Sequence, residues 1–401
     1  MDAADIGSLR LDDDTLTLAQ KICYLNGVTS GGDNEYDGHM GVRISSLFVI
    51  LVLSSMATFF PVMARRVRWL RIPLFVYLFV RYFGAGVIVA TAFIHLLDPA
   101  YSEIGPNTCV GLTGGWSSYS FVPAIVLVTV MVIFCMDLGA KVYVERKYGL
   151  GDDHASHNPE HLITDQQDGV HTHNGHIHDA HSSTAGDIAL APVAETGPES
   201  TPPTGHSDKS NGEYVASASP RTSSEDYSKT DELQIKQSFE QQIAAFYILE
   251  FGVIFHSIII GLNLAVSGWD DFKVLYIVII FHQSFEGLGI GARMSMIPFP
   301  RHLKMMPWLL CAAYGLTTPL AIAIGLGVRT AYNPESFTAS IVSGVLDSIS
   351  AGILIYTGLV ELLAADFLFN PQRTKNTKRL LFMLGSVALG AGLMALLGKW
   401  A

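Results

Sequence analysis

Two short polar motifs, each set inside a long apolar stretch, contain the residues best suited to chemistry. The first reads HSIIIGL over residues 256–262, and the second reads HQSFEGL over residues 282–288. Glu286 follows His282 by four positions, so a helix places both side chains on one face. If the two helices meet at these motifs, two imidazoles and one carboxylate converge, a set that suits Zn²⁺ or Fe²⁺. The pattern predicts a metal site formed by His256, His282 and Glu286.

Few other ionisable residues interrupt the apolar stretches, where a charge is costly and marks a candidate functional position. Six of them are candidates either for ligands along the route of a metal ion or for structural roles: His95, Asp98, Glu250, Asp347, Glu361 and Asp366. Each also has a plainer alternative, as an interhelical hydrogen bond or as an anchor at the membrane surface. Asp347 lies deeper in its stretch, where a structural role is open to it. Glycines beside the two motifs should let neighbouring backbones approach closely: Gly261, Gly287, Gly289 and Gly291.

The composition identifies the elements that must position these residues as membrane spans. Of the 401 residues, 49% are apolar and only 15% are charged, whereas a soluble protein carries about 25% charge. A helix needs about 20 apolar residues to cross the hydrocarbon core. Eight stretches qualify, which predicts an all-α integral membrane protein with eight transmembrane helices: residues 44–64, 73–97, 120–144, 242–267, 272–295, 305–330, 337–369 and 379–398.

Charge in the loops orients these spans. Basic residues cluster after spans 1, 3, 5 and 7, while the alternate loops are mainly acidic. Since Lys and Arg concentrate on the cytosolic side, both termini are expected outside the cell. The net charge of −11 argues against a nucleic-acid partner. The expected organisation is an acidic extracytosolic segment over 1–42, spans 1–3 over 43–147, a cytosolic loop over 148–238, and spans 4–8 over 239–401.

Two features lie outside the spans. Cys23 and Cys109 share the extracytosolic side, where they form either a disulfide or two free thiols. The loop over 148–238 is rich in Ser, Thr, Pro, Gly, Asp and His, which predicts disorder. Its histidines either contact metal or belong to a solvated low-complexity tract: His171, His173, His176, His178 and His181.

Taken together, these motifs resemble the ZIP (Zrt-, Irt-like) metal transporters, particularly the fungal plasma-membrane branch for zinc uptake. The resemblance rests on ATAFIHLLDPA in span 2, on the two motifs above, on SAGILIYTGLVELLAADF in span 7 and on the His-rich loop. It implies an eight-helix bundle with an inverted 3+2+3 repeat, in which spans 1–3 and 6–8 flank spans 4 and 5. It also implies that His256, His282 and Glu286 hold the transported metal.

Some members of that family bind two metals, and this sequence departs from their pattern. Ile260 stands where those members have a bridging acidic residue in span 4. Ser257, Gln283 and Thr318 align with the Asn, Asp and Glu of their second site. The resemblance therefore implies one main site here, with Ser257 and Gln283 as weak oxygen ligands or supporting donors.

The resulting expectation is an importer of Zn²⁺, with zinc as the transported substrate and no resident cofactor. His95 and Asp98 are expected at the entrance, and Glu250, Glu361 and Asp366 at the exit. An inside-negative potential would favour inward movement of a divalent ion by roughly 4.6 kcal/mol per 100 mV. The expected partners are divalent metal ions and the lipid bilayer, and a homodimer is left open. The alternatives are an importer of Fe²⁺ or Mn²⁺, an intramembrane metal-dependent hydrolase, and a metal sensor.

Overall fold

The computed structural model describes residues 36–66, 73–148, 224–370 and 374–400, together with residues 18, 21 and 23. Within these residues the regular secondary structure is helical, with no strand, and eight helical stretches are long and apolar enough to cross a membrane. This confirms the all-α, eight-span prediction. The compact unit that contains the spans comprises Met1–Leu150 and Lys229–Ala401. A second unit, Gly151–Ser228, contains the five loop histidines, which lie outside the described residues, so their metal contact stays a prediction.

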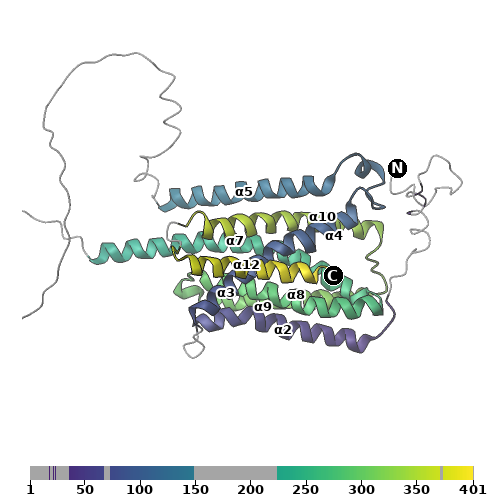
Figure 1. The fold of residues 1–401 in the computed structure, drawn as a ribbon, viewed down its shortest axis with the longest axis horizontal. Helices are drawn as coiled ribbons and strands as arrows, with labels where there is room; N and C mark the ends of the chain where they lie inside the picture. The colour runs from purple at the N-terminus through teal and green to yellow at the C-terminus, as the bar shows by residue number, and fades with distance from the viewer. Residues whose placement is uncertain are drawn as a thin grey trace, which may run out of the picture. The chain divides into compact units, whose positions relative to one another are not determined.

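The helices follow one another in alternating directions (Figure 1). Six spans are single helices. Span 1 is α2 (Met40–Arg66), span 3 is α5 (Phe121–Tyr148) and span 4 is α7 (Ser224–Val266). Span 5 is α8 (Trp269–Met296), span 6 is α9 (Met306–Val328) and span 8 is α12 (Thr377–Leu397). Span 2 joins α3 (Leu74–Ala90), η3 (Thr91–Leu97) and α4 (Asp98–Ile104), and span 7 joins α10 (Phe337–Tyr356), η6 (Thr357–Ala364) and α11 (Ala365–Phe367). Two short 3₁₀ turns, η4 (Gly114–Ser118) and η5 (Arg301–Leu303), lie in the connections before α5 and α9.

Two boundaries differ from those that hydropathy predicts. Span 2 continues to Ile104, seven residues beyond its predicted end, because Ala100 and Ile104 are buried against apolar side chains of α10. The helix of span 4 begins at Ser224, inside the segment predicted to be disordered over 148–238. The sequence DELQIKQSFEQQ over 231–242 is rich in strong helix formers, and this propensity explains the longer helix.

Spans 2 and 7 share a second feature, a π-helical segment. These segments, η3 with the sequence TAFIHLL and η6 with the sequence TGLVELLA, both begin at a threonine. The Thr91 hydroxyl donates to the carbonyl of Val87 at 3.0 Å, and the Thr357 hydroxyl donates to the carbonyl of Ile353 at 2.8 Å. Spans 2 and 7 are also the pair that the expected inverted repeat would relate. A π-helical turn shifts the register of the side chains that follow it and is frequent at functional sites.

Glycines set the closest helix crossings. A Cβ on Gly84 of α3 would collide with the backbone of Gly289 of α8, and a Cβ on Gly291 would collide with the Thr58 carbonyl of α2. Gly261 faces α9 instead, at Thr318 and Ala321. The predicted close approach is therefore present, but these glycines bring α7 and α8 against α9, α2 and α3 rather than against each other. Small residues are the usual means of such packing in membranes.

A buried arginine secures the turn between α7 and α8. Arg43 of α2 is fully buried and donates to the carbonyls of Leu264, Ala265 and Ser267 at the end of α7. Arg43 also donates to Asp37, whose other oxygen accepts from the backbone N–H of Trp269 at the start of α8. The pair satisfies backbone groups at both helix ends that have no partner within their own helix. It thereby attaches α2 to the helices that carry the two motifs.

Cys23 and Cys109 form a disulfide that links the N-terminal region to the connection between α4 and α5. The structure thus decides between the two alternatives that the sequence left open. Cys135 and Cys311 lie inside spans as free thiols, the first exposed and the second buried.

Candidate metal centre

The structure brings the three residues of the two motifs together. The ring centroids of His256 on α7 and His282 on α8 are 5.3 Å apart. One turn further along α8, the Glu286 Oε2 atom lies 3.8 Å from the Nε2 atom of His282. All three residues are buried, with 3%, 3% and 0% of their surfaces exposed. The spacing of the motifs therefore gives the convergence that it predicts.

Several atoms of this cluster that could bind a metal have no hydrogen-bond partner within the described structure. They are both ring nitrogens of His256, Nε2 of His282 and Oε1 of Glu286. A buried polar atom without a partner costs about 1–3 kcal/mol, so a cluster of them points to a ligand. The same described residues contain no group of three or more His, Cys, Asp or Glu in a ready metal-holding arrangement. The cluster thus offers donors without enclosing an ion.

The three residues that align with a second metal site also lie in the interior. Ser257, Gln283 and Thr318 are buried, with exposures of 0%, 1% and 0%. The hydroxyls of Ser257 and Thr318 and both terminal amide atoms of Gln283 lack hydrogen-bond partners among the described residues. Their oxygens are neutral donors that bring no negative charge, and Ser257 and Gln283 directly follow the two histidines in the sequence. This chemistry fits weak or supporting ligands of one ion.

The two residues predicted at the entrance lie in different environments. His95, in η3, is buried and packs edge-on against His282 with ring centroids 4.8 Å apart. Its Nε2 atom lies 3.0 Å from the Met394 carbonyl of α12. Asp98 opens α4 and is exposed. His95 is therefore a direct neighbour of the central cluster, and Asp98 lies further along the span.

The residues predicted at the exit divide similarly. Glu250 is buried on α7 with an unpartnered Oε2 atom within the described structure. Glu361, in η6, lies 3.6 Å from Lys141 Nζ and 3.8 Å from an Arg293 nitrogen. Asp366, in α11, accepts a hydrogen bond from Arg81 at 2.6 Å.

Glu361 and Asp366 also line a cavity of about 340 Å³, together with Arg81 and Arg293. An ion that reaches these carboxylates must therefore compete with basic side chains already beside them.

Two residues were not predicted as neighbours of the three central residues. Asp347 of α10 is buried, and its Oδ1 atom lies 3.8 Å from the Nδ1 atom of His256. Tyr314 of α9 donates to Glu286 Oε2 at 3.4 Å and to the Gln283 carbonyl at 3.1 Å. Asp347 could be recognised from the sequence as a carboxylate in an apolar stretch, but the sequence did not show that it lies beside His256. Tyr314 gave no signal, because a tyrosine in an apolar span is unremarkable by sequence.

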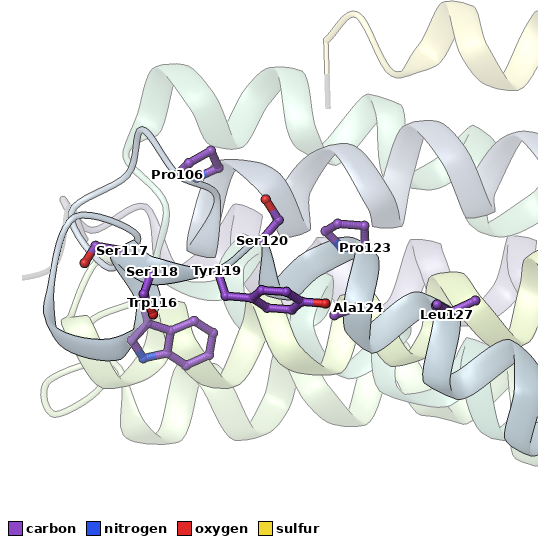
Figure 2. Close-up of a pocket in the computed structure, with 9 residues that line it drawn as sticks. All are labelled: Pro106, Trp116, Ser117, Ser118, Tyr119, Ser120, Pro123, Ala124 and Leu127. Atoms are coloured by element: carbon purple, nitrogen blue, oxygen red, sulfur yellow. The ribbon is translucent and has the colours of Figure 1, made fainter.

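A cavity of about 440 Å³ at the connection between α4 and α5 has a different character (Figure 2). Figure 2 shows Trp116 and Tyr119 beside the first turns of α5. Its lining contains serine hydroxyls and apolar groups but no carboxylate, imidazole or thiol. Its chemistry therefore does not suit a transition metal, and the central cluster remains the candidate metal centre.

Eight apolar helices around a buried set of imidazoles and carboxylates define a membrane protein with a polar interior suited to a divalent cation. The chain belongs to the ZIP zinc transporter family, whose profile matches residues 40–398. This assignment confirms the family expected from the motifs and identifies a transporter rather than an enzyme.

Similar proteins span nearly the whole chain. Zinc-regulated transporter 1 of Saccharomyces cerevisiae is 52% identical over 397 residues, which cover 99% of this chain and 97% of that protein. Zinc-regulated transporter 1 of Schizosaccharomyces pombe is 39% identical, covering 93% and 89% of the two chains. Zinc-regulated transporter 2 of S. cerevisiae is 36% identical, covering 93% and 97%. No solved structure matches the chain.

Proposed function

We propose that this transporter imports Zn²⁺ into the cytosol through the centre formed by His256, His282 and Glu286. The observation that carries the proposal is the set of unpartnered nitrogen and oxygen atoms on three buried side chains of two neighbouring spans. Imidazole and carboxylate are established zinc ligands, and the relatives named above are zinc-regulated transporters. Ser257 and Gln283 supply supporting oxygens.

The ion follows a route through the spans. Asp98 and His95 receive it at the entrance, since His95 contacts the His282 ring. Glu250, Glu361 and Asp366 form the exit, where Lys141, Arg293 and Arg81 neutralise the last two carboxylates between passages. The histidines over 171–181 then receive the metal in the cytosol. The membrane potential supplies about 2.3 kcal/mol per charge per 100 mV along this route.

The proposed location is the plasma membrane, with both termini outside the cell. Two observations support this orientation. The basic loops all fall on the side opposite the termini, and the Cys23–Cys109 disulfide suits an oxidising compartment. An epitope tag before residue 1 should react with antibody on intact cells. Reactivity only after permeabilisation would contradict the orientation.

Uptake of ⁶⁵Zn²⁺ by proteoliposomes tests the function. His282→Ala and Glu286→Ala should abolish saturable uptake, because each removes a ligand of the centre. Ser284→Ala is the matched control, since its hydroxyl bonds the Ile280 carbonyl of its own helix, and it should transport normally. Deletion of 154–181 should leave uptake intact. Normal uptake by the two ligand variants would refute the central site.

The same vesicles distinguish the other cargoes. A ligand set with two imidazoles selects borderline metals over Mg²⁺ and Ca²⁺, which prefer oxygen. Zn²⁺ should therefore outcompete Fe²⁺ and Mn²⁺, and a reversed order would assign one of these as the main cargo. A homodimer stays a prediction, which the mass of the purified protein by light scattering would test.

A further inference from the structure

Asp347 is a buried carboxylate for which the route described above has no use. It lies on α10, with 4% of its surface exposed, and faces His256 across the interface with α7. Its Oδ1 atom and both nitrogens of His256 lack hydrogen-bond partners within the described residues. At the separation recorded between them the two groups do not satisfy each other fully, so both keep donor atoms available to a ligand.

The distance between the two groups agrees with a shared ion. The Asp347 Oδ1 and His256 Nδ1 atoms are 3.8 Å apart, which is too long for a hydrogen bond. Bonds from zinc to oxygen and nitrogen are about 2.0–2.2 Å long. Two such bonds span at most roughly 4.4 Å, so one ion fits between these atoms. Glu286 and His282 show the same 3.8 Å separation.

The surroundings of Asp347 differ from those of the exit carboxylates. Glu361 lies beside Lys141 and Arg293, whereas no lysine or arginine of the described residues pairs with Asp347, which faces the imidazole of His256. A carboxylate neutralised by arginine or lysine needs no metal, whereas one that faces an imidazole offers a second ligand to the same ion.

A second carboxylate leads from Asp347 toward the surface. Glu103 of α4 is half-buried, lies against Ser340 of α10, and interacts electrostatically with both Asp347 and the exposed Glu335. The close crossing of α4 and α10 at Gly344, where a Cβ would meet the side chains of Glu103 and Ile104, sets this arrangement. Gly344 lies one turn before Asp347 on α10, so Glu103 packs beside the turn of α10 that leads to the buried Asp347.

We propose that Asp347 is a ligand of the transported divalent cation, shared with His256, and that Glu103 delivers the cation to it along the α4–α10 interface. This inference rests on the proposed function. It adds a carboxylate from α10 to a site otherwise built from α7 and α8, and a second approach beside that of His95 and Asp98.

Co²⁺ binding to the purified full chain tests the ligand role, because the absorption spectrum of Co²⁺ reports its ligands. Asp347→Cys should produce a thiolate-to-cobalt charge-transfer band, since a thiolate at a ligating position bonds the metal. Ser348→Cys is the matched control: it places a thiol on the same helix, where the native hydroxyl bonds the Gly344 carbonyl. The control and the wild type, whose Cys135 and Cys311 are free, should lack the band.

Affinity and transport give the second measurement. Asp347→Asn should weaken Co²⁺ binding by at least about 10- to 100-fold, the range for loss of groups that only support a metal ligand, with Ser348→Ala unchanged. Glu103→Gln should raise the KM for ⁶⁵Zn²⁺ uptake and leave the maximal rate unchanged, because it acts before the centre. Thermal unfolding of each variant identifies any that fails to fold, and the cysteine spectrum then decides the ligand role.

The outcomes separate this inference from the function on which it rests. Wild-type uptake that is lost in Glu286→Ala, together with Asp347 variants that bind Co²⁺ normally and show no charge-transfer band, would overturn the ligand role alone. Absence of both uptake and Co²⁺ binding in the wild type would overturn the proposed function and this inference with it. A charge-transfer band specific to Asp347→Cys supports the inference.

Discussion

At the scale of single residues, the centre combines donors that ordinary folding would have paired. His256, His282 and Glu286 are almost completely excluded from solvent, yet several of their polar atoms lack partners in the described structure. Such an arrangement disfavours the folded state, and a protein retains it where function needs it. A transporter must also bind its cargo, and unpaired donor atoms of this kind are available to a passing cation.

Tyr314 supports this centre through its hydroxyl, which donates to Glu286 Oε2 at 3.4 Å. Tyr314→Phe should weaken zinc affinity by about tenfold, the lower range for loss of a group that orients a metal ligand. The measurement is the KM of ⁶⁵Zn²⁺ uptake. Tyr119→Phe is the control, since Tyr119 is an exposed tyrosine in the connection before α5, outside the centre. Equal KM values for the two variants would remove Tyr314 from the site.

At the scale of the elements, helix crossings and helix ends hold the donors in register. The α3–α8 crossing at Gly84 and Gly289 sets how closely η3, with His95, approaches the α8 face that carries His282. The π-helical segments η3 and η6 place His95 and Glu361 at matching positions after Thr91 and Thr357. The Arg43 cap then fixes where α7 ends and α8 begins.

The glycine crossing can be tested by adding one methyl group. Gly84→Ala should destabilise the protein by about 1–3 kcal/mol, the usual cost of overpacking, because its Cβ would meet the Gly289 backbone. Gly385→Ala on α12 is the matched control, since its Cβ would meet nothing within 4 Å. Thermal unfolding in detergent should rank Gly84→Ala well below Gly385→Ala. Similar unfolding temperatures would mean that the crossing can relax.

A separate prediction concerns Arg43, which caps the turn between α7 and α8. Arg43→Ala leaves the carbonyls of Leu264, Ala265 and Ser267 without their donor. The expected loss is about 1–3 kcal/mol of stability for each group left buried and unsatisfied, together with weaker zinc uptake. Arg301→Ala, on an exposed turn, should behave as wild type in both measurements. Wild-type stability of Arg43→Ala would show that water replaces the guanidinium.

At the scale of the whole helical unit, the described helices pack in two sets. α2, α8 and α9 pack on one another, while α3 packs on α12, and α10 packs on α5, α4 and η3. The two sets meet directly where α3 packs on α8 at the Gly84–Gly289 crossing. α7 contacts both sets, with Gly261 against α9 and Gly252 against Ile353 and Leu354 of α10. The centre therefore lies between the sets: His282 and Glu286 come from the first, and His95 and Asp347 from the second.

The Cys23–Cys109 disulfide joins distant parts of this unit and closes a separation of 86 residues. Replacement of both cysteines by serine should reduce stability by about 2–5 kcal/mol, the usual effect of losing a native disulfide. Thermal unfolding of the double variant checks this, with Cys135→Ser as the control for a free thiol. The disulfide should also shift the wild type, but not the double variant, on gels run without reductant.

The eight spans could be predicted from the sequence. A segment that crosses a bilayer must form all its backbone hydrogen bonds within a helix and carry about 20 predominantly apolar residues. His256, His282 and Glu286 could be predicted for a similar reason. Their spacing within the two motifs fixes how they are arranged on a helix, whatever the tertiary packing. Asp347 and Tyr314 were not placed beside them, because their positions depend on how α9 and α10 cross α7 and α8. The longer span 2 likewise depends on Ile104 finding apolar partners on α10.

The division of ligands between two packed sets has a consequence for speed. An ion bound at once by Glu286 from one set and Asp347 from the other would link the two sets of helices. Release of the ion would require both bonds to break, so the ligand proposed at Asp347 would tighten capture and slow turnover. Tight binding favours uptake of scarce metal, whereas weak binding favours rapid transport of abundant metal. The side chain at position 347 would set the balance between affinity and transport rate.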